Sequence, residues 1–239
     1  MNRLLLMGLV LLLLAACGSD RTASRDSATG PSRSKPAALV NDFRIVPGSR
    51  VGPVRATTTE ADLLRQLGKE VVTTGDTIYG PEGTEWIGTT LYKGRPDQVH
   101  ILYRDSLLRR QPELVLIRTE LTDADGRPLP NPSPGRWATA DGLRVGTTLR
   151  ALEHRNGRPF RLWGFAWDYG GAVSSWQGGR FDAGPRTALT VTLGPGPDLT
   201  PAQARALDRV LGDREFGSTS SAMQVLNPRV QSLQVRLNP

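Results

Sequence analysis

The sequence predicts an α+β fold made of two tandem repeats, each a short helix packed on an antiparallel sheet. Three observations indicate this class. An apolar strand, a glycine, a threonine-capped helix and a second glycine occur in this order twice. Alternating apolar segments follow each copy, and Gly-rich turns separate them at spacings typical of hairpins. Each helix is about two to three turns long, too short to be stable alone, so we expect it to lie against a sheet.

The first 16 residues have the pattern of a secretory signal peptide. A short positive region, Asn2-Arg3, precedes an apolar run from Leu4 to Leu14. The run is too short to span a bilayer comfortably, and small residues end it, as in secretory signals. We therefore expect residues 1–16 to be removed.

The end of this segment, Leu14-Ala15-Ala16-Cys17, resembles the lipobox of bacterial lipoproteins. The resemblance implies cleavage before Cys17, a diacylglyceryl thioether on its sulfur and an acylated α-amine, with chains such as palmitate. Several acyl chains give lasting membrane attachment. Since Gly18 is not the Asp that retains lipoproteins at the inner membrane, the resemblance implies a lipid-anchored location in the cell envelope, at the outer membrane in a cell that has two.

Composition limits the remaining partners. Residues 17–41, the lipidated cysteine and a linker, are rich in Ser, Thr, Gly, Pro and charge, which predicts a flexible spacer. The formal net charge is +7, but the basic residues are scattered and often stand beside acidic ones. A nucleic-acid-binding protein would show a basic stripe or cluster, so we expect no nucleic-acid partner.

The first repeat is predicted over residues 42–126. A capping box at Thr59 starts its helix, and Gly68 ends the helix. The expected strands are Phe43 to Val46, Val51 to Val54, Val71 to Thr74, Thr77 to Tyr79, Trp86 to Tyr92, Val99 to Tyr103 and Leu114 to Leu121.

A joint rich in Pro and Asn is predicted over residues 127–136. Just before it, Asp123-Ala124-Asp125-Gly126 resembles half of a calcium loop. Such a loop needs five or more oxygen ligands, and no further acidic residue follows nearby. We therefore interpret it as a hairpin turn and expect no metal.

The second repeat is predicted over residues 137–239, with an extra helix and strand at its C-terminal end. Either Thr147 or Thr148 can cap its first helix, and Asn156-Gly157 stops that helix. The other expected elements are a strand Gly142 to Gly146, a hairpin of Phe160 to Trp167 with Ala172 to Gln177, a strand Thr187 to Leu193, a helix from Thr200-Pro201, a short strand Met223 to Leu226 and a strand Val230 to Leu237.

The two repeats correspond imperfectly. If Val51-Gly52 is matched with Val145-Gly146, the spacing to Leu63 and to Leu152 differs by about five residues. The doubled pattern resembles the tandem α+β fold of β-lactamase-inhibitor-protein-like domains, and one copy resembles the small lipoproteins of the outer-membrane-protein assembly machinery. The run from Asn156 to Gly171 is also similar to uncharacterised secreted bacterial proteins. These resemblances imply a fold and carry over no functional residue.

The most informative stretch is the second hairpin, within a segment from Trp137 to Phe181 that holds four of the five tryptophans. Alternation predicts one face with Arg161, Trp163, Phe165 and Trp167, and an opposite face with Phe160, Leu162 and Ala166. The aromatic face is either core or an exposed ligand platform beside arginines. We expect it to be partly exposed at one end. The candidate ligand-binding residues are Arg161, Trp163, Phe165, Trp167 and Tyr169, with Trp167 as the main contact.

No catalytic constellation is evident. The two histidines, His100 and His154, stand in a predicted strand and a predicted helix, and no nucleophile elbow, phosphate loop or metal-ligand spacing occurs. Asp168 is the best acidic candidate, although a turn Asp commonly bonds its own backbone. The sequence thus predicts non-catalytic binding of a protein or glycan, without a cofactor. The alternatives are an envelope hydrolase that uses Asp168 or a histidine, and an inhibitor of a secreted enzyme.

Overall fold

The computed structural model describes residues 41–118, 135–182 and 188–238. Every described residue belongs to one compact unit. The predicted signal peptide, Cys17, nearly all of the linker, the Asp123–Gly126 turn and most of the joint lie outside the described residues. The described part has four helices and three sheets in which antiparallel pairs predominate, which confirms the α+β class. No helix in these ranges is long and apolar enough to cross a membrane.

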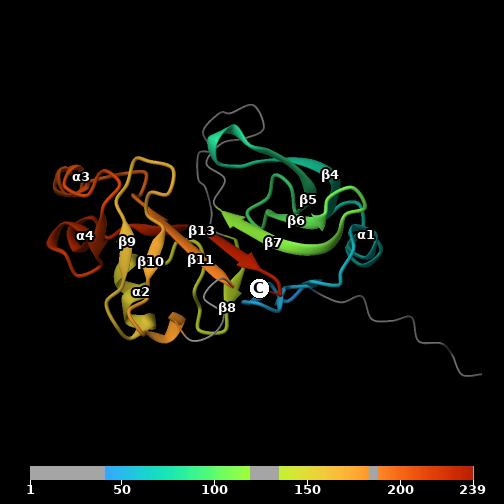
Figure 1. Ribbon diagram of the computed structural model, residues 1–239, viewed down its shortest axis with the longest axis horizontal. Coiled ribbons are helices and arrows are strands. Elements are labelled where there is room, and N and C mark those ends of the chain that lie inside the picture. The colour runs from blue at the N-terminus through green and yellow to red at the C-terminus, as the bar shows by residue number, and fades with distance from the viewer. Residues whose placement is uncertain (1–40, 119–134, 183–187, 239) are drawn as a thin grey trace, which may run out of the picture. The chain divides into compact units, whose positions relative to one another are not determined.

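The largest sheet has six strands in the order β11-β13-β7-β6-β5-β4, all paired antiparallel (Figure 1). The C-terminal strand β13 lies between β11 and β7, so strands from both predicted repeats share this sheet. Residues predicted as two strands, Val71 to Thr74 and Thr77 to Tyr79, form one strand with a register shift between Thr73 and Asp76. The strands are β4 (Val72–Tyr79), β5 (Glu85–Leu91), β6 (Val99–Asp105), β7 (Arg110–Arg118), β11 (Leu189–Gly194) and β13 (Arg229–Arg236).

Two smaller sheets complete the fold. The first has the order β3-β2-β1-β8, with β8 (Ala138–Thr139) parallel to β1 (Arg44–Val46). The predicted strand Val51 to Val54 is instead two short strands, β2 (Arg50–Val51) and β3 (Val54–Arg55), because Gly52 turns the chain with φ 53°. The second sheet has the order β10-β9-β12, from β9 (Arg161–Trp163), β10 (Val173–Ser175) and β12 (Glu215–Gly217).

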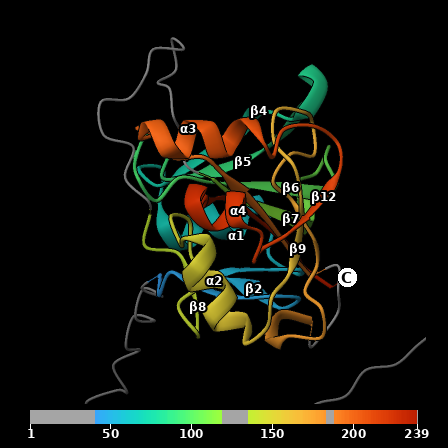
Figure 2. The same ribbon diagram turned by 90° about the vertical axis from the view of Figure 1, so that its left-hand side faces the viewer.

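Each helix begins at a hydroxyl cap. The helices are α1 (Glu60–Leu67), α2 (Leu149–Asn156), α3 (Pro201–Asp208) and α4 (Ser221–Leu226), and short 3₁₀ turns occur at Pro81–Gly83 and Arg180–Asp182. The predicted capping box of Thr59 with Asp62 is confirmed. The predicted strand Met223 to Leu226 is wrong, because the Ser220 side chain accepts from the Met223 amide and starts α4 there. Figure 2 shows α3 and α4 near each other, with α2 below them.

A further prediction fails between β8 and α2. Residues Gly142 to Gly146 form turns and irregular backbone rather than a strand. Leu143 and Val145 are nevertheless buried. The apolar pattern therefore predicted their burial correctly, but its prediction of a β-strand was wrong.

The entries to α1 and α2 make the same hydrogen bonds. The Arg55 amide donates to Thr58 Oγ1 over 3.0 Å, and the Arg144 amide donates to Thr147 Oγ1 over 3.2 Å. Each arginine then leads, at equal spacing, to a fully buried leucine, Leu63 or Leu152. Matching Arg55 with Arg144 differs from the predicted match of Val51 with Val145. With this match the two copies have the same spacing up to the buried leucine.

The first residues of these helices are also anchored alike. The Glu60 amide donates to the Arg109 carbonyl over 3.1 Å, and the Leu149 amide donates to the Pro228 carbonyl over 2.7 Å. Arg109 directly precedes β7 and Pro228 directly precedes β13, the two strands that pair within the large sheet.

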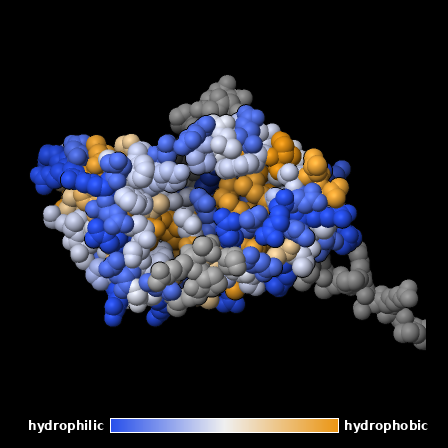
Figure 3. Space-filling model, viewed as in Figure 1, coloured by the Kyte–Doolittle hydropathy of each residue, from blue (hydrophilic) through white to orange (hydrophobic). Residues whose placement is uncertain are grey.

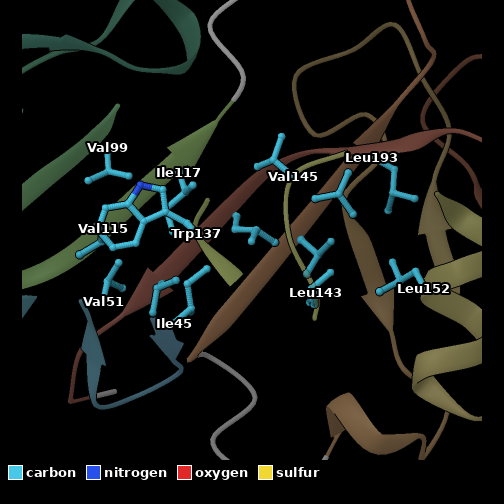
Figure 4. Packing of buried hydrophobic residues seen from close by; sticks show 14 of the residues in the cluster. Ile45, Val51, Val99, Val115, Ile117, Trp137, Leu143, Val145, Leu152 and Leu193 are labelled. Atoms are coloured by element: carbon cyan, nitrogen blue, oxygen red, sulfur yellow. The ribbon is translucent and has the colours of Figure 1, made fainter. Parts of the chain in front are cut away.

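One apolar core runs through both predicted repeats (Figure 4). Trp137 is 1 % exposed and lies among Val99, Val115 and Ile117 of the large sheet. Its ring N–H donates to the Asp97 carbonyl over 2.9 Å, which satisfies the polar atom of the buried ring. Leu152 of α2 belongs to the same cluster at its other end.

Candidate functional site

The aromatic hairpin is shorter than its sequence pattern indicates. β9 ends at Trp163, and Ala166 has a left-handed φ of 66°, which breaks the alternation. The Phe165 amide donates to the Val210 carbonyl and its carbonyl accepts from the Gly212 amide, both over 2.9 Å. Phe165 is therefore directed into the core and is 5 % exposed. The expectation that it shares a face with Trp163 and Trp167 is wrong.

The outer face of the three-stranded sheet carries the remaining hairpin candidates. Arg161 and Trp163 are two residues apart on β9, so their side chains lie on one face, and Leu162 points to the core, fully buried. Glu215 of β12 pairs directly with Trp163, which places its side chain on the same outer face. Arg161, Trp163 and Glu215 are all partly exposed.

Two more aromatic rings continue this face beyond the end of β9. The rings of Trp163 and Trp167 have centroids 5.7 Å apart at an interplanar angle of 88°, and those of Trp167 and Tyr169 are 5.4 Å apart at 65°. The ring N–H of Trp167 donates to the Gly164 carbonyl over 2.9 Å, which fixes its orientation. Tyr169, in the hairpin turn, is 62 % exposed. We call Arg161, Trp163, Trp167, Tyr169 and Glu215 the aromatic platform.

A carboxylate is fixed beside these rings. Glu215 accepts from Arg161 Nε over 2.7 Å. A hydrogen bond from the Ser174 side chain, and then the bond from Arg161, hold the pKa of Glu215 below its ordinary value. The platform therefore presents an ionised carboxylate and a guanidinium in fixed positions next to aromatic rings.

The other sequence candidates are dispersed. Asp168 is exposed in the turn between Trp167 and Tyr169. His100 is 5 % exposed within β6, and its Nδ1 is 2.9 Å from Thr90 Oγ1. His154 is exposed on α2. Trp176 packs against Phe160 and Phe181, apart from the platform rings, and no cluster of metal-ligating side chains occurs in the described ranges.

Glu215 and Ser174 belong to this site, although neither was predicted as a site residue from the sequence. Glu215 lies 54 positions after Arg161, on a three-residue strand that shows no alternating pattern of its own. Ser174 stands in the returning strand of the predicted hairpin, where its alternation with Val173 was the available signal.

No family model, curated protein or solved structure matches this chain.

Proposed function

We propose that this protein is a lipid-anchored cell-envelope protein that binds a cell-wall or surface glycan, without catalysis, through the aromatic platform. The observation that carries the proposal is the row of three rings, Trp163, Trp167 and Tyr169, left partly exposed beside a bonded Arg161–Glu215 pair.

The chemistry of the platform suits sugars. A pyranose ring has an apolar C–H face that can lie on an aromatic ring, while its hydroxyls need donors and acceptors at the edge of the contact. Glu215 supplies acceptors and Arg161 supplies donors, and their mutual hydrogen bond limits the side-chain entropy lost on binding. The exposed phenol of Tyr169 adds a further donor and acceptor at the end of the row.

The proposed location rests on Cys17. Its place at the end of a lipobox-like segment supports attachment to the membrane by acyl chains, and the following linker would separate the folded unit from the bilayer. Such a protein meets envelope glycans within the reach of its linker.

We further propose that the folded unit arose by internal duplication. The support is the pair of equivalent helix entries, each with an Arg-to-Thr hydrogen bond and an anchored first residue. Under this proposal the last strand of each copy, β7 or β13, pairs with the other within the large sheet.

A binding assay on purified peptidoglycan tests the proposed function. We expect the full chain to sediment with insoluble peptidoglycan, and Trp167→Ala and Tyr169→Ala to reduce the bound fraction about tenfold, in the range of binding hot spots. Tyr79→Ala is the matched control, since Tyr79 is 60 % exposed but lies on β4, outside the platform. Binding that the platform variants and the control retain equally would refute the proposal. If the platform variants keep peptidoglycan binding but no longer bind an envelope protein that the unmodified chain binds, a protein partner is favoured.

A further inference from the structure

A partly buried ion pair between Glu60 and Arg109 lies where α1 meets the large sheet. Glu60, the first residue of α1, is 8 % exposed. Its carboxylate accepts from Arg109 Nε, from Thr89 Oγ1 over 2.7 Å and from the Gly75 amide over 3.1 Å. Glu60 thus holds Arg109 twice, because its amide also donates to the Arg109 carbonyl.

Tyr103 extends this network. Its hydroxyl donates to Thr89 Oγ1 over 2.8 Å, and burial raises the pKa of Tyr103 to about 12. The phenol therefore remains a hydrogen-bond donor throughout the physiological pH range. Arg109 itself has a left-handed φ of 46°, a conformation that costs a residue with a side chain some stability.

The first residue of α2 makes the same backbone hydrogen bond to the residue before a sheet strand, but without charged side chains. There the amide of Leu149 donates to the carbonyl of Pro228, where α1 has Glu60 and Arg109. Both leucine and proline are apolar, so the backbone junction between a helix start and a sheet strand does not require an ion pair. The partly buried pair of Glu60 and Arg109 is therefore an addition to this backbone junction in α1.

Arg109 lines a cavity of about 360 Å³. The cavity is open to solvent on one side. Its apolar lining residues are Trp86, Ile87, Leu102 and Leu107, and its polar ones are Glu85, Tyr103, Ser106 and Arg109. Ile87 is 47 % exposed and Leu107 is 87 % exposed, so apolar surface remains open to solvent here. Figure 3 shows hydrophobic side chains gathered over β5 and β6 and toward the turn that follows β6.

We propose that this cavity binds a small apolar molecule that carries a single carboxylate. Within the described part of the chain, Glu60 engages the guanidinium through Nε, and the two terminal nitrogens of Arg109 have no hydrogen-bond partner. A guanidinium fixed at one edge presents its other donors in the fork geometry that matches a carboxylate. The apolar walls accept the body of the ligand, and the cavity volume is within the range of small-molecule sites.

Glu85 narrows the ligand class further. It is exposed and lines the same cavity, so a second negative charge on the ligand would meet repulsion there. The site therefore favours a monocarboxylate. Two sources share this chemistry: a free fatty acid and the C-terminal end of an apolar peptide.

Titration of the full chain with octanoate, followed by the indole N–H signal of Trp86 and by side-chain methyl signals, tests the proposal. We expect saturable shifts for Trp86, Leu102 and Leu107, and binding at least about tenfold weaker for 1-octanol, which has the same tail but no charge. Acetyl-Leu-Phe and its C-terminal amide form a second arm, in which only the free acid should bind. Whichever acid binds more tightly identifies the source, and both results support the site. Equal binding of octanoate and octanol, or shifts elsewhere only, would overturn the proposal.

Matched variants distinguish binding in the cavity from non-specific hydrophobic binding. Leu107→Ser should weaken octanoate several-fold, whereas Leu108→Ser, a neighbouring exposed leucine that does not line the cavity, should leave it unchanged. Arg109→Lys keeps a cation beside Glu60 but removes the fork, so we expect about tenfold weaker octanoate binding and unchanged octanol binding. Equal effects of Leu107→Ser and Leu108→Ser would contradict the assignment.

Discussion

Truncation of three neighbouring aromatic residues should separate core from platform. Phe165 is 5 % exposed, so Phe165→Ala removes a buried ring and should destabilise the fold by about 3–5 kcal/mol. Trp167 is partly exposed and has two edge contacts, with Trp163 and Tyr169, each worth about 0.5–1.5 kcal/mol. Trp167→Ala should therefore cost about 1–3 kcal/mol, and Tyr169→Ala, at a 62 % exposed position, about 1 kcal/mol or less.

Urea unfolding followed by far-ultraviolet circular dichroism measures these differences. For a domain of this size, 1 kcal/mol lowers Tm by roughly 2–4 °C, so the three variants should also separate in thermal melts. The losses of glycan binding should follow the opposite order when the variants are compared at the same fraction of folded protein. Trp167→Ala and Tyr169→Ala should lose the most binding, and Phe165→Ala should lose little. A loss of stability in Trp167→Ala equal to that in Phe165→Ala would refute the platform, because the ring would then be core.

Three other predictions concern the anchor, the shared sheet and a helix cap. Cys17→Ser should accumulate as an unlipidated precursor in a mass measurement, and unchanged size with unchanged detergent partitioning would contradict lipidation. Leu63 and Leu152 are fully buried on α1 and α2, and replacing either with alanine should lower the free energy of unfolding by about 2–5 kcal/mol. Each variant should still unfold in one transition, because the pairing of β7 with β13 joins both halves; two separate transitions would contradict this. Hydrogen bonds from the Thr59 amide, the Thr59 hydroxyl and Arg65, in this order of size, lower the pKa of Asp62 from 3.8 to about 2. The ionised carboxylate therefore stabilises the folded state above pH 3.8, and this contribution is lost as the pH falls toward 2. Asp62→Asn should remove that part of the dependence of stability on pH.

Local signals predicted the helix starts well. The hydroxyls of Thr59 and Thr200 cap α1 and α3 as expected, because a cap depends on residues within one turn. Of the two candidates for α2, Thr147 and Thr148, the cap is Thr148. The same rule explains the error at Met223 to Leu226, where Ser220 is the cap that the apolar pattern concealed. The final strand was predictable from the alternation of Leu233 and Val235, both fully buried.

Long-range contacts could not be predicted in this way. The pairing of β13 with β7 decides that both halves share a sheet, yet nothing near either strand specifies its partner. Phe165 lies in the core because its backbone bonds to Val210 and Gly212, 45 or more positions away, and its own position in the sequence gives no sign of these bonds. The Glu60–Arg109 pair joins residues 49 positions apart, so only the folded chain reveals it.

The five tryptophans offer the most direct test of the aromatic platform, since their indole N–H signals report on separate parts of the fold. A titration of the full chain with a soluble β-1,4-linked N-acetylglucosamine oligomer should shift the signals of Trp163 and Trp167. The signals of Trp137, in the core, and Trp176, packed on Phe160, should stay in place, as should that of Trp86 at the Arg109 cavity. Unchanged Trp163 and Trp167 signals, or equal shifts of all five, would contradict glycan binding by the platform.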